Sequence, residues 1–154
     1  MKVSISYRNK KISLDTKCRV SILSDNSGIG KTYLLKVIKQ AIEASEYSPL
    51  KAEKNGSECK DIYLILENTP INIIRETIVK NGFIIIDECD ILFTDYPELI
   101  DIVNKNREAD YMLIMRGIPS GLEVNTDSQL VFKNMYGNII IEPFESRLKS
   151  FFDD

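Results

Sequence analysis

Several residue types that enzymes often use are absent or scarce in this 154-residue chain. The sequence contains no histidine, which excludes catalysis by imidazole and metal sites with histidine ligands. Its three cysteines, Cys18, Cys59 and Cys89, form no C-x-x-C pair, so neither a zinc ribbon nor a dithiol redox site is expected. We expect reduced thiols, as in a cytoplasmic protein.

Long hydrophobic segments are also absent. No stretch approaches the roughly 20 apolar residues of a membrane-spanning helix, and the N-terminal MKVSISYRNK lacks the apolar core of a signal peptide. The net charge of −3 argues against a protein whose main task is to coat nucleic acid. These absences predict a soluble, cytoplasmic protein without membrane insertion, and a nucleic-acid partner is not indicated.

The first third of the chain predicts strands followed by one helix. Alternating residues in KVSISY and KISLD, separated by RNKK, indicate an antiparallel N-terminal hairpin, and CRVSILS indicates a third strand. Apolar residues at spacings of three and four then predict a helix over about residues 30–46. The segment from Ser48 to Lys60 has no periodicity and is interpreted as a surface connection.

The rest of the chain alternates short apolar runs with helical segments. In order these are DIYLIL, PINIIRETIVKN, GFIIIDE, PELIDIVNKN and YMLIMR. Apolar runs of about six residues are typical of parallel strands covered on both faces. Thr69 before Pro70 and Asp95 before Pro97 are interpreted as helix N-caps.

A C-terminal hairpin is predicted from QLVFKNMYGNIIIEPF, with its turn at MYGN. Taken together, the segments predict an α/β fold in which helices flank a mainly parallel central sheet, with β-hairpins at the N-terminal and C-terminal ends. The length fits a single domain over residues 1–154.

Residues 23–35, LSDNSGIGKTYLL, carry the features of a phosphate-binding loop. Glycines let backbone amides face inward, Lys31 supplies a positive charge for the β and γ phosphates, and Thr32 is a candidate Mg²⁺ ligand. The N-terminus of the following helix also favours an anion. We expect nucleotide contacts from Asn26, Ser27, Gly28, Ile29, Gly30, Lys31 and Thr32. Asp25 replaces the consensus first glycine, and aspartate tolerates the positive φ of such a turn.

A second motif, FIIIDECD, places acidic residues 56 positions beyond the lysine. Asp87 follows a predicted buried strand, at the edge where open α/β sheets bind ligands. It is a candidate Mg²⁺ ligand, and Glu88 is a candidate to orient and deprotonate an attacking water. Asp90 is interpreted as a cap or as support for Asp87.

Together these motifs resemble P-loop NTPases of the division that has an additional strand and a catalytic glutamate after the Walker B aspartate. IIIDECD is similar to the Asp-Glu-x-Asp pattern of AAA+ proteins, whereas the N-terminal hairpin and LVFKNMYGNIIIEP are similar to the ends of ABC-type ATPase domains. The resemblance implies a single P-loop nucleotide-binding domain that binds ATP with Mg²⁺. It also implies that YMLIMR lies between the CRVSILS and GFIIIDE strands.

The resemblance further implies that DIYLIL lies toward the sheet edge, which favours a structural role for Glu67 and Asn68 after it. The chain lacks an L-S-G-G-Q-like signature, a convincing Q-loop and a C-terminal helical lid. Where ABC domains carry a switch histidine, it has Arg116, for which a contact with a γ-phosphate and a salt bridge to a surface carboxylate are equally open. No N/T-K-x-D motif reads guanine, so adenine is expected.

The predicted function is ATP hydrolysis that gates or drives a protein partner, with catalytic roles for Lys31, Glu88 and Arg116. Asp25 and the missing trans-acting elements leave an alternative, in which the chain hydrolyses little and signals by nucleotide occupancy. A small-molecule kinase is disfavoured because arginines are few and Asp-Glu suits water activation. The expected partners are ATP and either another protein or further copies of this chain.

Overall fold

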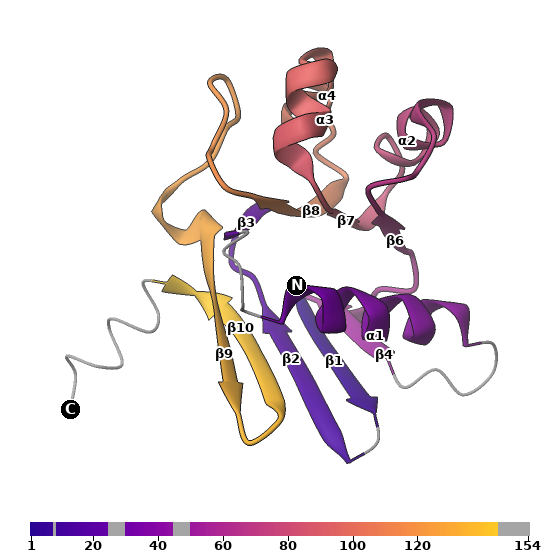
Figure 1. The fold of residues 1–154 in the computed structure, drawn as a ribbon, viewed down its shortest axis with the longest axis vertical. Helices are drawn as coiled ribbons and strands as arrows, with labels where there is room; N and C mark the ends of the chain where they lie inside the picture. Colours follow the sequence, from indigo (N-terminus) through magenta and orange to yellow (C-terminus); the bar gives the residue numbers. More distant parts are fainter. Residues whose placement is uncertain (8, 25–29, 45–49, 145–154) are drawn as a thin grey trace.

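A computed structural model describes residues 1–7, 9–24, 30–44 and 50–144, which form a ten-stranded sheet curled around a helix (Figure 1). The strands are β1 (Lys2–Tyr7), β2 (Lys10–Asp15), β3 (Val20–Ser24), β4 (Leu50–Lys54), β5 (Ser57–Glu58), β6 (Ile62–Ile65), β7 (Gly82–Ile86), β8 (Ala109–Met115), β9 (Gln129–Met135) and β10 (Asn138–Pro143). The helices are α1 (Lys31–Glu43), α2 (Ile71–Thr77), α3 (Cys89–Asp95) and α4 (Glu98–Lys105), with a short 3₁₀ helix at Thr126–Ser128.

The sheet is mixed, so the prediction of a mainly parallel central sheet of the P-loop NTPase type is wrong. The strand order is β5-β4-β1-β2-β10-β9-β3-β8-β7-β6. Strands β9, β3, β8, β7 and β6 run parallel and are called the parallel half. Strands β5, β4, β1, β2 and β10 are called the antiparallel half, although β2 and β10 pair in parallel. The expectation fails because β10 pairs with both β2 and β9, which makes the terminal hairpins part of one continuous sheet.

Within the parallel half, β8 lies between β3 and β7, and β6 lies at the sheet edge. The positions expected for YMLIMR and DIYLIL are therefore confirmed. All seven residues of β8 are buried. Burial on both faces explains why residues 111–115 of this strand are a continuous apolar run with no alternation, while the buried Asp110 is paired with Lys54.

The interpretation of Ser48 to Lys60 as a surface connection is wrong, because its described part, residues 50–60, contains β4 and β5. Asn55 (φ 53°) and Gly56 (φ 81°) make the two-residue turn between them. Ala52 is buried while its neighbours Lys51 and Glu53 are exposed. Because the buried residue of β4 is the small Ala52, the alternation of apolar and polar residues is weak in the sequence. The Asn-Gly pair, which is typical of a two-residue hairpin turn, was the feature that indicated these strands.

The two faces of the sheet carry separate cores. The helix α1 lies inside the curl, where Leu34, Val37 and Ile38 pack with residues of both halves, among them Ile5 and Met112 (Figure 1). Helices α2, α3 and α4 cover the outer face of the parallel half. The members of that outer core include Ile84, Ile86, Phe93, Leu99, Val103 and Leu113.

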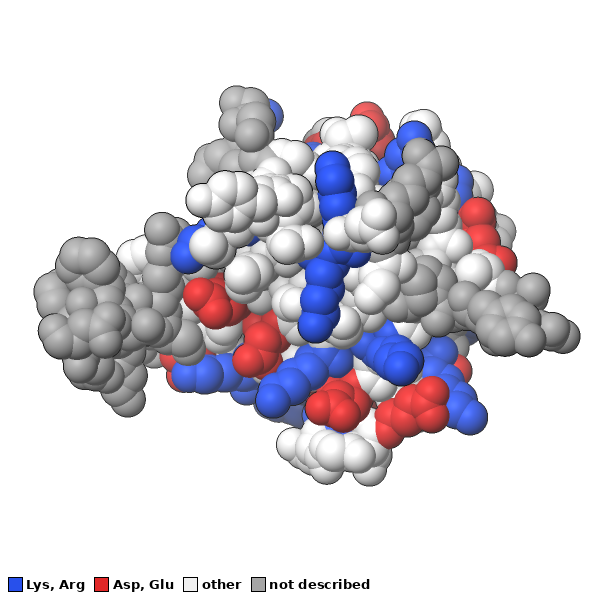
Figure 2. Space-filling view, turned by 90° about the horizontal axis from the view of Figure 1, so that it is seen from below, with Lys and Arg blue, Asp and Glu red and all other residues white. Residues whose placement is uncertain are grey.

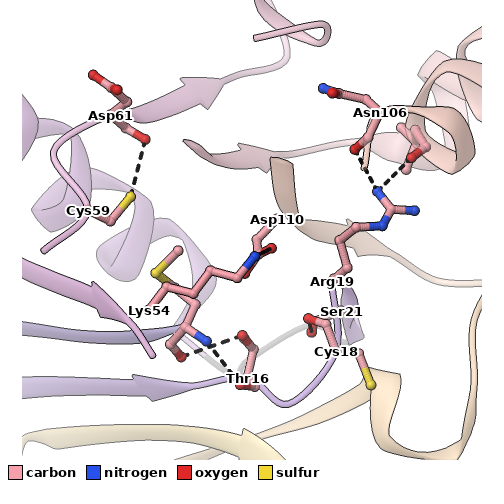
Figure 3. Close-up of polar contacts among 11 residues, drawn as sticks. Thr16, Cys18, Arg19, Ser21, Lys54, Cys59, Asp61, Asn106 and Asp110 are labelled. Carbon is pink, nitrogen blue, oxygen red and sulfur yellow. Dashed lines mark hydrogen bonds and ion pairs between the residues drawn. The ribbon is translucent and has the colours of Figure 1, made fainter. Parts of the chain in front are cut away.

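Two polar ties hold distant segments together (Figure 3). Lys54 Nζ lies 2.8 Å from Asp110 Oδ1, which links β4 of the antiparallel half to β8 of the parallel half. The Arg19 guanidinium donates to the backbone carbonyls of Val103 and Asn106 at the end of α4, at 2.8 and 3.0 Å. Partial burial lowers the pKa of Arg19 from its usual value.

The helix starts differ from the predicted caps. Thr69 Oγ1 accepts a hydrogen bond from Leu66 N, and Pro70 is the N-cap of α2. Asp95 ends α3, a helix that was not predicted, and Pro97 is the N-cap of α4. Both interpretations fail because these side chains have no cap hydrogen bond with the following helix.

Other expectations hold. The hairpins β1–β2 and β9–β10 are confirmed, and the first helix is slightly shorter than the predicted 30–46. Within the described ranges, no helix has the length and apolar character needed to cross a membrane.

Candidate functional site

The start of α1 brings Lys31 and Thr32 to the end of β3. Gly30 is the N-cap, with a left-handed backbone (φ 85°, ψ 20°) that other residues adopt at a cost, and a Cβ there would meet the Phe132 ring at 3.4 Å. The 13 residues of α1 direct the positive end of the helix toward this point. The rest of the predicted loop, residues 25–29, lies outside the described residues.

Two acidic residues meet Lys31 at the end of β7. The Lys31 Nζ atom lies 3.3 Å from Asp87 Oδ1 and 3.4 Å from Glu88 Oε1. Asp87 is fixed through its backbone N–H, which donates to Ile65 O at 2.9 Å. The structure therefore brings together three of the predicted residues, which come from two segments far apart in the sequence.

Glu88 has an unusual backbone for a residue with a side chain. It is the N-cap of α3 and adopts left-handed angles, φ 52° and ψ 43°. A non-glycine residue in this region costs on the order of 1–3 kcal/mol, and such residues cluster at functional sites. This backbone directs the chain from β7 into α3 while the Glu88 carboxylate remains beside Lys31.

The Asp87 carboxylate has a buried oxygen, Oδ1, that accepts no hydrogen bond within the described part of the chain. Its ion pair with Lys31 balances charge but lacks hydrogen-bond geometry. A buried acceptor without a donor is costly, so this oxygen suits a cation. Carboxylate and hydroxyl oxygens are ligands that Mg²⁺ prefers, and Asp87 and Thr32 line the same cleft.

Because no group of three or more Cys, Asp or Glu suited to a metal is found among the described residues, Mg²⁺ held here would need water or phosphate oxygens as well. Such partial protein ligation is usual for Mg²⁺ bound together with a nucleotide. The residues present therefore fit the ion that the sequence implied.

An open cleft of about 680 Å³ surrounds these groups. This volume lies within the range of small-molecule sites. One wall is α1, with Lys31, Thr32, Lys36 and Lys39, and the other is the segment 66–70 after β6. We refer to it as the α1 cleft.

Glu67 and Asn68 line the α1 cleft, although the sequence favoured a structural role for them. They reach it because β6 is paired in parallel with β7, so the carboxyl ends of the two strands meet at one edge. Their position directly after a parallel strand next to β7 was the sequence feature that indicated a place in the site.

Asp90 anchors the turn after β8. Its carboxylate accepts hydrogen bonds from Arg116 N at 2.8 Å and, at a longer 3.3 Å, from Gly117 N. This is a support role, in line with the interpretation of Asp90 from sequence. The Arg116 side chain is exposed, does not line the α1 cleft and forms no ion pair with any described residue.

A second cleft, about 690 Å³, lies on the antiparallel half, between β10 and β4. Its charges oppose one another, since Lys2 is paired across the strands with Asp15 and with Glu53. It holds none of the predicted site residues. On the face seen from below in Figure 2, basic and acidic side chains likewise lie side by side.

Comparison of the chain with protein-family models, curated proteins and solved structures finds no match. The function must therefore be argued from the α1 cleft itself.

Proposed function

We propose that this chain binds ATP with Mg²⁺ in the α1 cleft and hydrolyses it, and that the nucleotide cycle gates or drives a protein partner. The observation that carries the proposal is the convergence of Lys31 with Asp87 and Glu88, within 3.4 Å, at the carboxyl edge of parallel strands. The likeness of the two motifs to those of P-loop NTPases supports it, although the sheet as a whole is mixed.

The roles follow from the chemistry of the side chains. Lys31 offers a positive charge to the β and γ phosphates, and Thr32 and Asp87 offer oxygens to Mg²⁺. The bound ion would neutralise charge on the phosphates. Glu88 is close enough to the lysine to hold a water beside the same phosphates and accept its proton. The unusual backbone of Glu88 supports a role that outweighs its conformational cost.

The second candidate is a module that binds nucleotide and signals by occupancy with little hydrolysis. One observation favours it: among the described residues that line the α1 cleft the cations are Lys31, Lys36 and Lys39, with no arginine. Arginine on the transferring phosphoryl group contributes on the order of 10³ to 10⁵ in rate in related chemistry. A chain without one depends on help from a partner for fast turnover.

Calorimetric titration with ATP and Mg²⁺ tests the site. Lys31→Ala should weaken binding by roughly ten- to a hundredfold, because a charge-assisted contact to phosphate contributes about 1.5 to 3 kcal/mol. Lys105→Ala, at the end of α4 and outside the cleft, is the matched control and should bind as the wild type does. Equal affinities for wild type and Lys31→Ala would contradict the assignment.

Phosphate release separates the two candidates. Glu88→Gln keeps size and hydrogen bonding but loses basicity, so it should bind ATP normally and hydrolyse it about 10² to 10⁴ times more slowly. If the wild type binds ATP but releases no more phosphate than Glu88→Gln, the occupancy module replaces the ATPase.

A further inference from the structure

A groove of about 230 Å³ lies between α2 and α3 and is continuous with the α1 cleft. The two hollows share Leu66, Glu67, Thr69, Asp87 and Glu88. Helices α2 and α3 are visible above β6 and β7 in Figure 1. We call this hollow the α2–α3 groove. A molecule bound in it would lie directly beside the residues assigned to phosphate and water.

The groove is apolar inside. Its lining includes Ile65, Ile71, Ile74 and Leu92, all buried or half-buried. Ile91, the third residue of α3, also lines the groove and is 55% exposed. The other apolar residues of this helix are buried or half-buried. An exposed branched aliphatic side chain beside an apolar hollow favours contact with another apolar group.

The rim of the groove is acidic. Among the described residues, its lining contains four carboxylates, Glu67, Asp87, Glu88 and Asp95, and no lysine or arginine. Asp87 and Glu88 are paired with Lys31 from the neighbouring cleft. Glu67 and Asp95 are exposed and form no ion pair with any described residue. The nearby Arg75 is already engaged, since it contacts Glu98 at 2.6 Å.

We propose that the α2–α3 groove is a docking site for a basic, aliphatic segment of a partner protein. An aliphatic side chain of that segment enters the groove against Ile91, and arginines or lysines that flank it contact Glu67 and Asp95. The carboxylates of Glu67 and Asp95, which pair with no described residue, disfavour acidic peptides and nucleic acid as occupants, because their charge has the same sign. Burial of the aliphatic group supplies affinity, while the charge pairs fix orientation.

The docking site also explains how a partner acts on the nucleotide, and this step rests on the proposed function. Glu67 lines both hollows. A cation bound by Glu67 adds positive charge next to the phosphates, where the described lining has lysines but no arginine. Docking and hydrolysis are thereby coupled through a shared carboxylate.

Binding is tested first, without nucleotide, by fluorescence anisotropy with labelled 12-residue peptides and the full chain. The probe carries leucines at positions i and i+4 with arginines between them; one control replaces leucine by serine, and another replaces arginine by glutamate. Both controls should bind at least tenfold more weakly than the probe. Equal binding of the serine peptide would overturn the proposal, because charge alone would then explain attraction.

Variants locate the site. Ile91→Asp and Asp95→Lys should each weaken probe binding at least tenfold; both residues are exposed, so folding should be unaffected, which circular dichroism checks. Val79→Asp, 54% exposed but outside the groove, and Asp101→Lys on α4 are matched controls and should bind normally. Loss of binding in the controls but not in the groove variants would overturn the assignment.

Three further outcomes are decisive. Sedimentation of the wild type and Ile91→Asp shows whether a second copy occupies the groove; an Ile91-dependent dimer that excludes the probe would overturn the proposal of a foreign partner. Lys31→Ala should bind the probe at least as tightly as the wild type, because it removes a cation beside Asp87 and Glu88, so failure of nucleotide binding and failure of docking are distinguishable. Saturating probe should raise phosphate release at least tenfold, and an unchanged rate with intact docking would overturn the coupling.

Discussion

The parallel and antiparallel halves differ in how many faces they bury. Ile84 and Ile85 are neighbours in β7, yet both are almost fully buried, at 0% and 2% exposure. In β2, Leu14 is buried between half-buried Ser13 and exposed Asp15. The parallel half, which is covered on both faces, carries the candidate acidic residues where its strands end. The antiparallel half packs one face against α1.

Truncation of adjacent core residues should show the largest difference between the halves. Ile84→Ala and Ile85→Ala should each lower the free energy of unfolding by about 2–5 kcal/mol, because each side chain fills a different core. In β2, Leu14→Ala should be costly but Ser13→Ala nearly neutral. Urea unfolding measures all four. A neutral result for either isoleucine would contradict coverage of both faces of β7.

Removal of the tie between the halves should have the next largest effect. Lys54→Ala leaves the Asp110 carboxylate, only 5% exposed, without its 2.8 Å partner and should cost about 1–3 kcal/mol. Lys51→Ala changes a neighbouring outward-facing residue of β4 and serves as the control. If the two variants are equally stable, Lys54 does not hold the halves together.

Asp90→Ala should have a smaller effect that is confined to the parallel half. It removes the acceptor for Arg116 N and Gly117 N and should lower the free energy of unfolding by about 1–2 kcal/mol, since water reaches this exposed turn. Amide hydrogen exchange should quicken at residues 116 and 117 while β1 and β2 stay protected. Uniform loss of protection across both halves would argue against a local anchor.

Alkaline pH should produce the mildest effect. Burial raises the pKa of the Cys89 thiol well above its usual range, so the folded chain keeps a proton that the unfolded chain releases near pH 8.5. The contribution to stability is therefore complete below about pH 8.5 and falls by up to about 1.4 kcal/mol per pH unit above it.

Denaturation at pH 8 and pH 9.5 checks the effect of Cys89. Cys89→Ala should flatten the alkaline decline, whereas Cys59→Ala, which changes a half-buried residue at the end of the β5 hairpin, should retain it. The same decline in both variants would assign the effect to other groups, among them Tyr111, whose pKa burial also raises.

The fold could be predicted from sequence where local pattern and tertiary environment agree. The strand β8 was recognisable because two buried faces require seven consecutive buried residues, and the β9–β10 turn was recognisable from Tyr136 and Gly137. The arrangement of the sheet was not, because pairing between β2 and β10 depends on contacts across most of the chain. The helix α3 was missed because only two residues separate it from the end of β7, so its first residues were assigned to the FIIIDECD motif.

The placement of the candidate residues was predictable where a residue is tied to a strand end and not where it depends on a neighbouring strand. Lys31, Asp87 and Glu88 follow directly from the motifs and lie together. Glu67 reaches the same cleft only because β6 pairs with β7, which the sequence does not state. For Arg116 the sequence left a γ-phosphate contact and a surface salt bridge equally open, and its side chain does not line the cleft.

The insertion of β10 between β2 and β9 constrains when the protein can fold during synthesis. Ile12 and Leu14 pair with Ile139 and Ile141, and the adjoining contact between Lys11 and Asn138 spans 127 positions. Strands β1, β2, β4 and β5 can pair with one another early, but the pairing of β2 with β10 must wait until almost all of the described chain has left the ribosome. Meanwhile one edge of β2 stays open to other strands, which makes the nascent chain a natural client for chaperones.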